Sequence, residues 1–284
     1  MNEVLNRIPN IKHTGSGMFF LMAGLARRDA DMLKTVAKTA CRITSGCVFL
    51  YSKRRTTRRT VRGSTRSAES AMKTLLLADI RRGFGVPVVT DIHNPEEAAI
   101  AAEYVDVLQI PAFLCRQTDL LVAAAKTGKV VNIKKGQFLA PEAMSFAAGK
   151  VRDAGNPNVM LTDRGTTFGY YDLIVDMRGI PAMQNLGYPV VMDITHSLQQ
   201  PNQTSGVTGG QPEMIETIAR ASVAAGVDGL FIETHPNPAI AKSDGANMLA
   251  LDRLESLLER LARIRGTINA FGIVFGRCRA AAVS

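Results

Sequence analysis

The stretch PVVMDITHS (189–197) decides the fold, because its apolar run ends abruptly in an acid and then an imidazole. Six further segments share this transition or a weaker form of it: FFLMAG (19–24), VPVVTDIH (86–93), VLQIPAF (107–113), VVNIKKGQF (130–138), VMLTDRG (159–165) and GLFIETHP (229–236). Runs of about four to six mostly β-branched residues without polar alternation are typical of strands buried on both faces, as in parallel sheets. Because α/β folds place their chemistry at the carboxyl ends of such strands, the pattern indicates an enzyme.

Helical patterns follow most of these segments. One helix is expected to begin at Pro95, and a second is capped by Thr118 and ends before Gly128. The other three run from Pro141 to Gly155, from Pro212 to Gly226 and from Leu249 to Gly266. The last two patterns place apolar residues at i, i+3, i+4 and i+7.

Counting CVFLYS (47–52) as the second strand gives eight strands that alternate with helices. This predicts a (β/α)8 TIM barrel at about 19–268, within a single domain of residues 1–284 that ends in a tail at 269–284. A doubly wound open sheet is the alternative, but no GxGxxG motif follows the first strand.

Composition suits a protein that works in the cytoplasm. Apolar residues make up 46% of the chain, and no apolar run reaches the roughly 18 residues that span a bilayer. Residues 1–10 lack a basic start followed by an apolar stretch, which predicts no secretory signal. The four cysteines, which are Cys41, Cys47, Cys115 and Cys278, stand singly and favour reduced thiols in a cytoplasm.

The net charge of +9 is concentrated in one atypical segment, KRRTTRRTVRGSTR (53–66). Seven basic residues lie there without an acid, so the rest of the chain carries only +2. The segment is a nucleic-acid arm, an exposed loop over a phosphate site, or a stretch foreign to the fold. Without an aromatic side chain between Lys53 and Arg66 to stack on bases, nucleic-acid binding is the least favoured of the three.

Cations close two neighbouring strands. Lys134 and Lys135 end the fifth strand and Arg164 ends the sixth, so fixed positive charge suited to phosphate and carboxylate oxygens is expected at the barrel mouth. Surface ion pairs are the alternative role for two of them. Arg116, in the loop after the fourth strand, is either another anion ligand or a solvated or subunit-contact residue.

His196, Glu233 and Asp244 form an imidazole and carboxylate set of the type that holds a divalent transition metal. Further titratable groups at the same mouth are Asp91, His93, Asp163, Asp193 and His235. For Asp163 and Asp193, helix capping or the orientation of neighbours is favoured over direct chemistry; for His93 and His235 the two roles are equally open. Anion-binding cations beside a metal-type triad suggest a lyase, aldolase or synthase acting on phosphorylated, carboxylated substrates.

Seven motifs that follow one another in a fixed order narrow the class of enzyme further. They are TDIHNPEEA, DVLQIPAFLCRQTDLL, VNIKKGQFLAPEAM, LTDRGTTFGY, VMDITHSLQQPN, GLFIETHPNP and AKSDGANMLAL. In this order they resemble the 3-deoxy-D-manno-octulosonate 8-phosphate synthase family, also called 2-dehydro-3-deoxyphosphooctonate aldolases. The similarity is dense from about residue 84 to 268. The related 3-deoxy-D-arabino-heptulosonate 7-phosphate synthases share the barrel, but QIPAFLCRQTDL and DITHSLQQPN are closer to the octulosonate enzymes.

The resemblance implies a transferase that condenses phosphoenolpyruvate with D-arabinose 5-phosphate and releases phosphate, on the way to lipopolysaccharide. It implies catalytic roles for Lys134, His196 and Asp244. Its substrate-binding set is Ala112, Phe113, Arg116, Lys134, Gln137 and Arg164, with Arg116 reaching the pentose phosphate of a neighbouring subunit in a homotetramer. His196, Glu233 and Asp244 correspond to ligands of a divalent metal, namely Zn, Fe, Mn or Co. No membrane partner is implied.

The chain departs from the family at two places. After Gly24 the family continues with Pro-Cys, the Cys being the fourth metal ligand, or carries an Asn in its metal-independent branch; here Leu25 and Ala26 follow. After the second strand the family's Lys-Ala-Asn-Arg-Ser/Thr substrate loop is replaced by the basic segment 53–66.

Three hypotheses about function follow from these departures: an active synthase, a catalytically impaired barrel of the same family whose substrate loop was lost through frameshifts, or a nucleic-acid-binding protein. A heptulosonate-type synthase is a further alternative.

Overall fold

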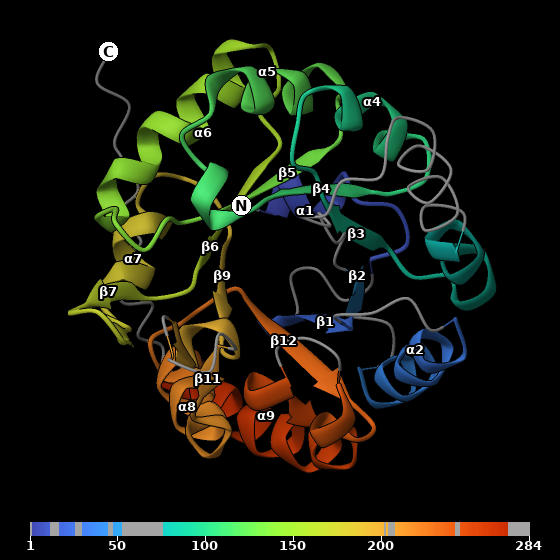
Figure 1. Cartoon of the computed structure of the whole chain (residues 1–284), viewed down its shortest axis with the longest axis vertical. Helices are drawn as coiled ribbons and strands as arrows, with labels where there is room; N and C mark the ends of the chain where they lie inside the picture. Colours follow the sequence, from blue (N-terminus) through green and yellow to red (C-terminus); the bar gives the residue numbers. More distant parts are fainter. Residues whose placement is uncertain are drawn as a thin grey trace.

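The computed structural model describes residues 2–11, 17–25, 30–44, 48–52, 76–201, 203, 208–241 and 245–271. Eight parallel strands form a closed barrel: β1 (Phe20–Leu25), β2 (Val48–Ser52), β3 (Val88–Asp91), β4 (Val107–Ile110), β5 (Val130–Lys134), β6 (Val159–Asp163), β9 (Val190–Asp193) and β12 (Gly229–His235). Pairing of β1 with β12, with Phe20 opposite Gly229, closes the ring. Figure 1 looks down this ring. The predicted TIM barrel is therefore confirmed.

Helices surround the barrel (Figure 1). They are α2 (Ala30–Thr44), residues 76–84, α4 (Glu96–Ala102), α5 (Thr118–Lys126), α6 (Met144–Asp153), α7 (Gly179–Gln184), α8 (Ile215–Ala224) and α9 (Leu254–Ala270). Glycines in the left-handed region follow the ends of α5, α6 and α8, at Gly128, Gly155 and Gly226. At these positions the closing glycines predicted from sequence are confirmed.

Each strand is buried on both faces because two cores lie on either side of the barrel wall. Between strands and helices, one core packs residues such as Leu108, Ile133 and Leu161 against helical Ala and Leu. Inside the ring, a smaller core packs Phe49, Val107 and Phe231 with neighbouring inward side chains. This double burial explains why the strands appear in the sequence as continuous apolar runs.

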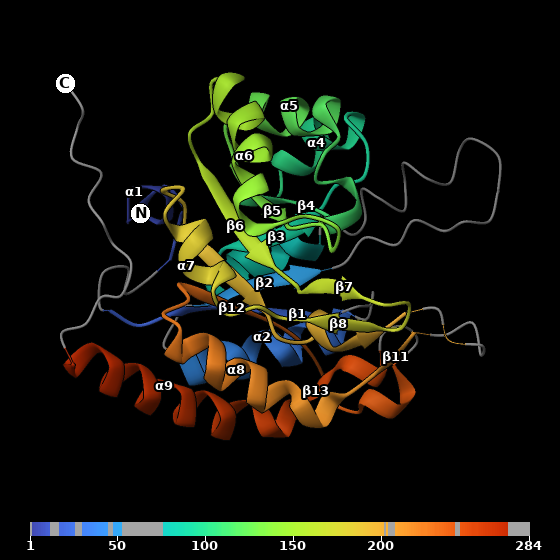
Figure 2. The ribbon, with the colours of Figure 1, turned by 90° about the vertical axis from the view of Figure 1, so that its left-hand side faces the viewer.

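The interior core is closed at one end by the N-terminal segment. Helix α1 (Asn2–Asn6) contributes Leu5, and Ile8 follows it, both buried within the interior cluster. Figure 2 shows α1 at the end of the molecule opposite the hairpin of β7 (Thr166–Phe168) and β8 (Asp172–Ile174). Because the strands of a parallel barrel share one direction, the charged strand ends lie at the end away from α1.

Several boundaries differ from those expected. Gln117, not Thr118, occupies the N-cap position of α5, and it makes no capping hydrogen bond through its side chain. The last helix begins at Leu254 rather than Leu249, because residues 249–250 form β13 (Leu249–Ala250) beside β12, and it continues past Gly266. The basic segment 53–66 and the tail beyond residue 271 lie outside the described residues. In the described part of the chain, no helix combines the length and the hydropathy that a membrane span requires.

Candidate active site

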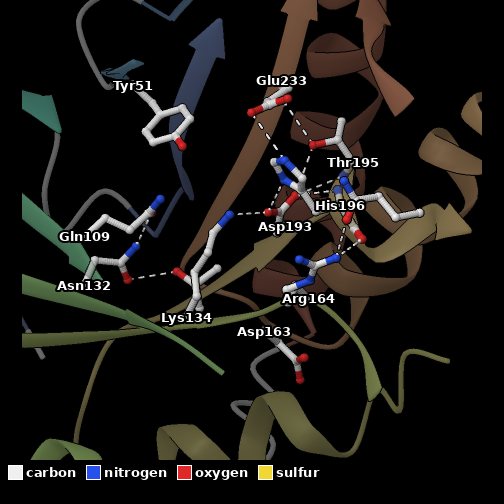
Figure 3. Close-up of polar contacts among 12 residues, drawn as sticks. Tyr51, Gln109, Asn132, Lys134, Asp163, Arg164, Asp193, Thr195, His196 and Glu233 are labelled. Carbon is white, nitrogen blue, oxygen red and sulfur yellow. Dashed lines mark hydrogen bonds and ion pairs between the residues drawn. The ribbon is translucent and has the colours of Figure 1, made fainter. Parts of the chain in front are cut away.

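Asp193, at the carboxyl end of β9, lies at the centre of the charged mouth. Its Oδ1 accepts hydrogen bonds from the backbone N–H of Thr195 (3.2 Å), the Thr195 hydroxyl (3.0 Å) and the backbone N–H of His196 (2.9 Å). Its Oδ2 lies 2.6 Å from both Lys134 Nζ and His196 Nδ1. The side chain is completely buried. Asp193 is therefore an orienting residue, as the sequence favoured, and it holds two predicted site residues at once (Figure 3).

Electrostatics within this group favour the charged forms. Burial alone would raise the pKa of Asp193, but the neighbouring His196 and Lys134 outweigh it and hold that pKa well below its usual range. Burial would lower the pKa of His196, yet the Asp193 and Glu233 carboxylates outweigh burial and raise it. Lys134 Nζ also lies 3.9 Å from the centroid of the Phe231 ring, a cation–π contact. Charge on both Asp193 and His196 is therefore favoured.

Arg164 is the second cation of the mouth and is almost completely buried. Its Nη2 donates to the His196 carbonyl at 2.9 Å and to Gln199 Oε1 at 2.6 Å. Both of these acceptors are neutral oxygens. In Figure 3, Arg164 and Lys134 come from adjacent strand ends and flank the Asp193 and His196 group. Such a pair suits a ligand that carries two anionic groups.

A chain of buried side chains, which we call the polar belt, lies beneath Lys134 and joins five neighbouring strands. Tyr51 donates to Asp91 Oδ2 (2.6 Å), Gln109 donates to Asp91 Oδ1 (2.7 Å), Asn132 donates to Gln109 Oε1 (2.9 Å), and Thr162 donates to Asn132 Oδ1 (2.8 Å). Burial first, and then the Asp91 charge, raises the pKa of Tyr51 well above its usual value. The sequence singled out only Asp91; inward-facing polar residues at alternate strand positions were the signal for the rest.

The structure separates Lys135 from the anion-binding cations with which the sequence grouped it. Successive strand side chains point to opposite faces, so Lys134 faces the barrel interior and Lys135 does not. The Lys135 ammonium instead meets the Gly165 carbonyl at 3.3 Å and the Thr166 hydroxyl at 3.1 Å, with Asp163 Oδ1 at 3.5 Å. Asp163 lies apart from the Lys134 group (Figure 3). The expectation that Lys135 lies among the mouth cations was wrong.

The other predicted substrate-binding residues lie on the loops that follow β4 and β5. Ala112 and Gln137 are buried, whereas Phe113 is 74% exposed and Arg116 is exposed. An exposed aromatic ring and guanidinium are available to groups outside this chain, which is compatible with the expected role of Arg116 at a neighbouring subunit.

The metal-type residues are only partly assembled among the described residues. His196 Nε2 lies 3.3 Å from Glu233 Oε1, and both side chains are buried. Asp244 and Ala26 fall outside the described residues. His235 Nδ1 accepts from the backbone of Asn237, and the rest of the described chain offers no group of three His, Cys, Asp or Glu side chains able to hold a metal. His196 and Glu233 could thus supply two ligands, and the described structure does not complete a metal site.

A parallel barrel that brings cations and an imidazole to its carboxyl-terminal mouth belongs to the class of TIM-barrel enzymes. Within this class, residues 22–269 match the family described as DAHP synthetase I, and the chain belongs to that family. It is 49% identical to the 2-dehydro-3-deoxyphosphooctonate aldolase of Brucella anthropi over 263 residues, which cover 90% of this chain and 94% of the relative. The aldolases of the same name from Brucella ovis and Brucella abortus are 47% and 46% identical over the same shares. The resemblance inferred from the ordered motifs is confirmed.

Proposed function

We propose that this chain condenses phosphoenolpyruvate with D-arabinose 5-phosphate to give 3-deoxy-D-manno-octulosonate 8-phosphate and inorganic phosphate. One observation carries the proposal: two buried cations, Lys134 and Arg164, flank an imidazole at the mouth of a barrel whose relatives are named 2-dehydro-3-deoxyphosphooctonate aldolases. Those names favour the octulosonate reaction over the heptulosonate alternative. The reaction makes the chain a transferase, and its product is a precursor of lipopolysaccharide.

Both cations have a clear part in this chemistry. Carbon 3 of the enol attacks the aldehyde carbon of the sugar, and water adds at carbon 2, after which phosphate leaves. The phosphate and carboxylate of phosphoenolpyruvate remain anionic throughout, so preorganised cations stabilise every stage. Lys134 and Arg164 supply that charge, and Asp193 keeps the Lys134 ammonium in place before the substrate arrives.

The remaining predicted residues complete the substrate site in this proposal. Ala112, Phe113 and Gln137 line the phosphoenolpyruvate pocket. Arg116, which is exposed here, reaches the pentose phosphate bound by a neighbouring subunit of a homotetramer. We place the enzyme in the cytoplasm as a single-domain barrel, because the four single cysteines favour a reducing compartment.

His196 and Glu233, with Asp244, are the residues that would hold a divalent metal in this family's metal-dependent branch. The described residues supply only two converging ligands for it, His196 Nε2 and Glu233 Oε1. As a protein group, His196 is positioned by Asp193 to donate a proton or a hydrogen bond at the mouth.

Calorimetric titration of phosphoenolpyruvate tests the proposal. The parent chain should bind it, and Arg164→Ala should lose on the order of 2 to 4 kcal/mol of binding free energy, because a charged hydrogen bond in a partly dry site is removed. Arg152→Ala is the matched control, since Arg152 is exposed and pairs only weakly with Asp153 at 3.4 Å. Unchanged affinity in Arg164→Ala would refute the assignment.

A further inference from the structure

Lys135 is a buried cation that the proposed chemistry does not use. Its side chain is 1% exposed, although charged residues are rarely buried this deeply. Its ammonium group has three N–H donors, and the structure supplies three acceptors: the Leu139 carbonyl at 3.3 Å, the Gly165 carbonyl at 3.3 Å and the Thr166 hydroxyl at 3.1 Å. A methionine of similar length would fill the same volume, so filling space does not require the charge.

These bonds join two loops that are far apart in the sequence. Leu139 belongs to the loop after β5, whereas Gly165 and Thr166 belong to the loop after β6 and the start of β7. A backbone hydrogen bond from Thr167 N–H to the Gln137 carbonyl, at 2.9 Å, joins the same two loops. We call this set of contacts the loop clasp. It connects the segments on which three predicted phosphoenolpyruvate ligands lie.

The loop clasp acts close to both mouth cations. Lys135 directly follows Lys134, and Gly165 directly follows Arg164. Asp163, on the other side of Arg164, accepts the Gly165 N–H at 2.8 Å and lies 3.5 Å from the Lys135 ammonium. Gly165 has a φ of 82°, a left-handed conformation that lets the chain turn immediately after Arg164. The Gly165 carbonyl and the Asp163 carboxylate, on the two sides of Arg164, are thus both held at the Lys135 ammonium.

We infer that Lys135 is a positioning residue that sets the spacing between the Lys134 ammonium and the Arg164 guanidinium, and thereby the affinity for phosphoenolpyruvate. This inference rests on the proposed function. The physical reason is that a ligand with two anionic groups at a fixed separation gains from both cations only when their spacing matches. In this arrangement Lys135 acts through the two loops, since its ammonium donates to the Leu139 carbonyl, the Gly165 carbonyl and the Thr166 hydroxyl.

Lys135→Met tests the inference, with Lys126→Met on the exposed end of α5 as the matched control. Phosphoenolpyruvate should bind Lys135→Met about tenfold more weakly, because small displacements of positioned groups are costly. Its KM should rise in proportion, while kcat at saturation stays within about twofold of the parent. Amide hydrogen exchange should accelerate in residues 136–139 and 164–168 and stay unchanged in the other strands.

Thr166→Val removes a single acceptor and keeps the test open if Lys135→Met does not fold; it should weaken binding in the same direction by a smaller factor. A folded Lys135→Met with parental affinity would overturn the inference. So would equal increases in KM for both substrates, or faster exchange throughout the barrel, since these indicate a merely structural role. A parent chain that binds no phosphoenolpyruvate would instead overturn the proposed function, and this inference with it.

Discussion

Asp193 illustrates how one buried carboxylate organises the mouth, because five donors converge on its two oxygens. In Asp193→Asn an amide NH2 group, which is itself a donor, replaces one of these oxygens. Both oxygen positions are surrounded by donors, so neither orientation of the amide restores the hydrogen bonds. We expect a loss of about 3 to 5 kcal/mol in the free energy of unfolding, the cost of leaving buried charges uncompensated. Urea unfolding provides the measurement.

The matched control for this change is Asp153→Asn, whose carboxylate is exposed and 3.4 Å from Arg152. That substitution should change stability by less than about 0.5 kcal/mol, as is usual for surface positions. Equal stability of Asp193→Asn and Asp153→Asn would show that the five contacts to Asp193 contribute nothing to the fold.

Asp106 makes the stability of the fold depend on pH. Burial, the largest cause, raises the pKa of Asp106, although the Val88 N–H and the Arg81 charge oppose it. The native state then binds this proton more tightly than the unfolded chain, so Asp106 favours the fold more as pH falls through its raised pKa toward the unfolded value of about 3.9. Asp106→Asn removes this contribution.

Urea unfolding of the parent and Asp106→Asn between about pH 7 and pH 4 measures the effect. The stability of the parent relative to the variant should increase as the pH is lowered. A relative stability that decreases with falling pH would mean that the Arg81 ion pair, at 2.8 Å, outweighs burial and that the pKa is lowered instead.

At the scale of elements, α1 closes the interior core opposite the mouth. Leu5 is 7% exposed and packs with the barrel-interior cluster. Leu5→Ala should destabilise the fold by about 2 to 4 kcal/mol, from the lost transfer free energy and the cavity left behind. Ile100→Ala on α4, a residue that is 49% exposed, is the control and should cost far less. Comparable losses in thermal or urea unfolding would exclude a closing role for α1.

The barrel strands were predictable because burial on both faces leaves continuous apolar runs, as in β5 and β9. The β7–β8 hairpin was not predicted, because β7 has only three residues, all exposed, and leaves no apolar pattern. The last helix began later than expected since residues 249–250 pair with β12, a tertiary contact that helical periodicity cannot reveal.

The candidate site likewise has residues that the sequence predicted and residues that it did not. Charges at strand ends located Lys134, Arg164 and His196 correctly at one mouth, because parallel strands bring their carboxyl ends together. The direction of Lys135 was missed, since adjacent residues of a strand face opposite sides and the exact strand end decides which one faces inward. Most members of the polar belt were missed although they lie on consecutive strands, because single polar residues within apolar runs do not show which of them face the barrel interior.

At the scale of the whole molecule, the basic segment 53–66 stands where the resemblance implies a substrate-binding loop. Replacing residues 53–66 with the family's Lys-Ala-Asn-Arg-Ser/Thr loop should increase condensation of the two substrates, because it restores cations for phosphate and an Asn for the sugar hydroxyls. Steady-state rates of the parent and the grafted chain give the comparison. A parent that the graft cannot improve would indicate that the native arginines already act as the substrate loop.

Condensation itself is the most direct measurement of the central claim. Purified chain is incubated with phosphoenolpyruvate and D-arabinose 5-phosphate, and the eight-carbon phosphorylated acid and released phosphate are quantified together, with Arg164→Ala as the negative control. The proposed function predicts equal amounts of both products from the parent, and a rate reduced about a hundredfold in Arg164→Ala. Phosphate release without the eight-carbon acid, or equal rates in parent and variant, would contradict it.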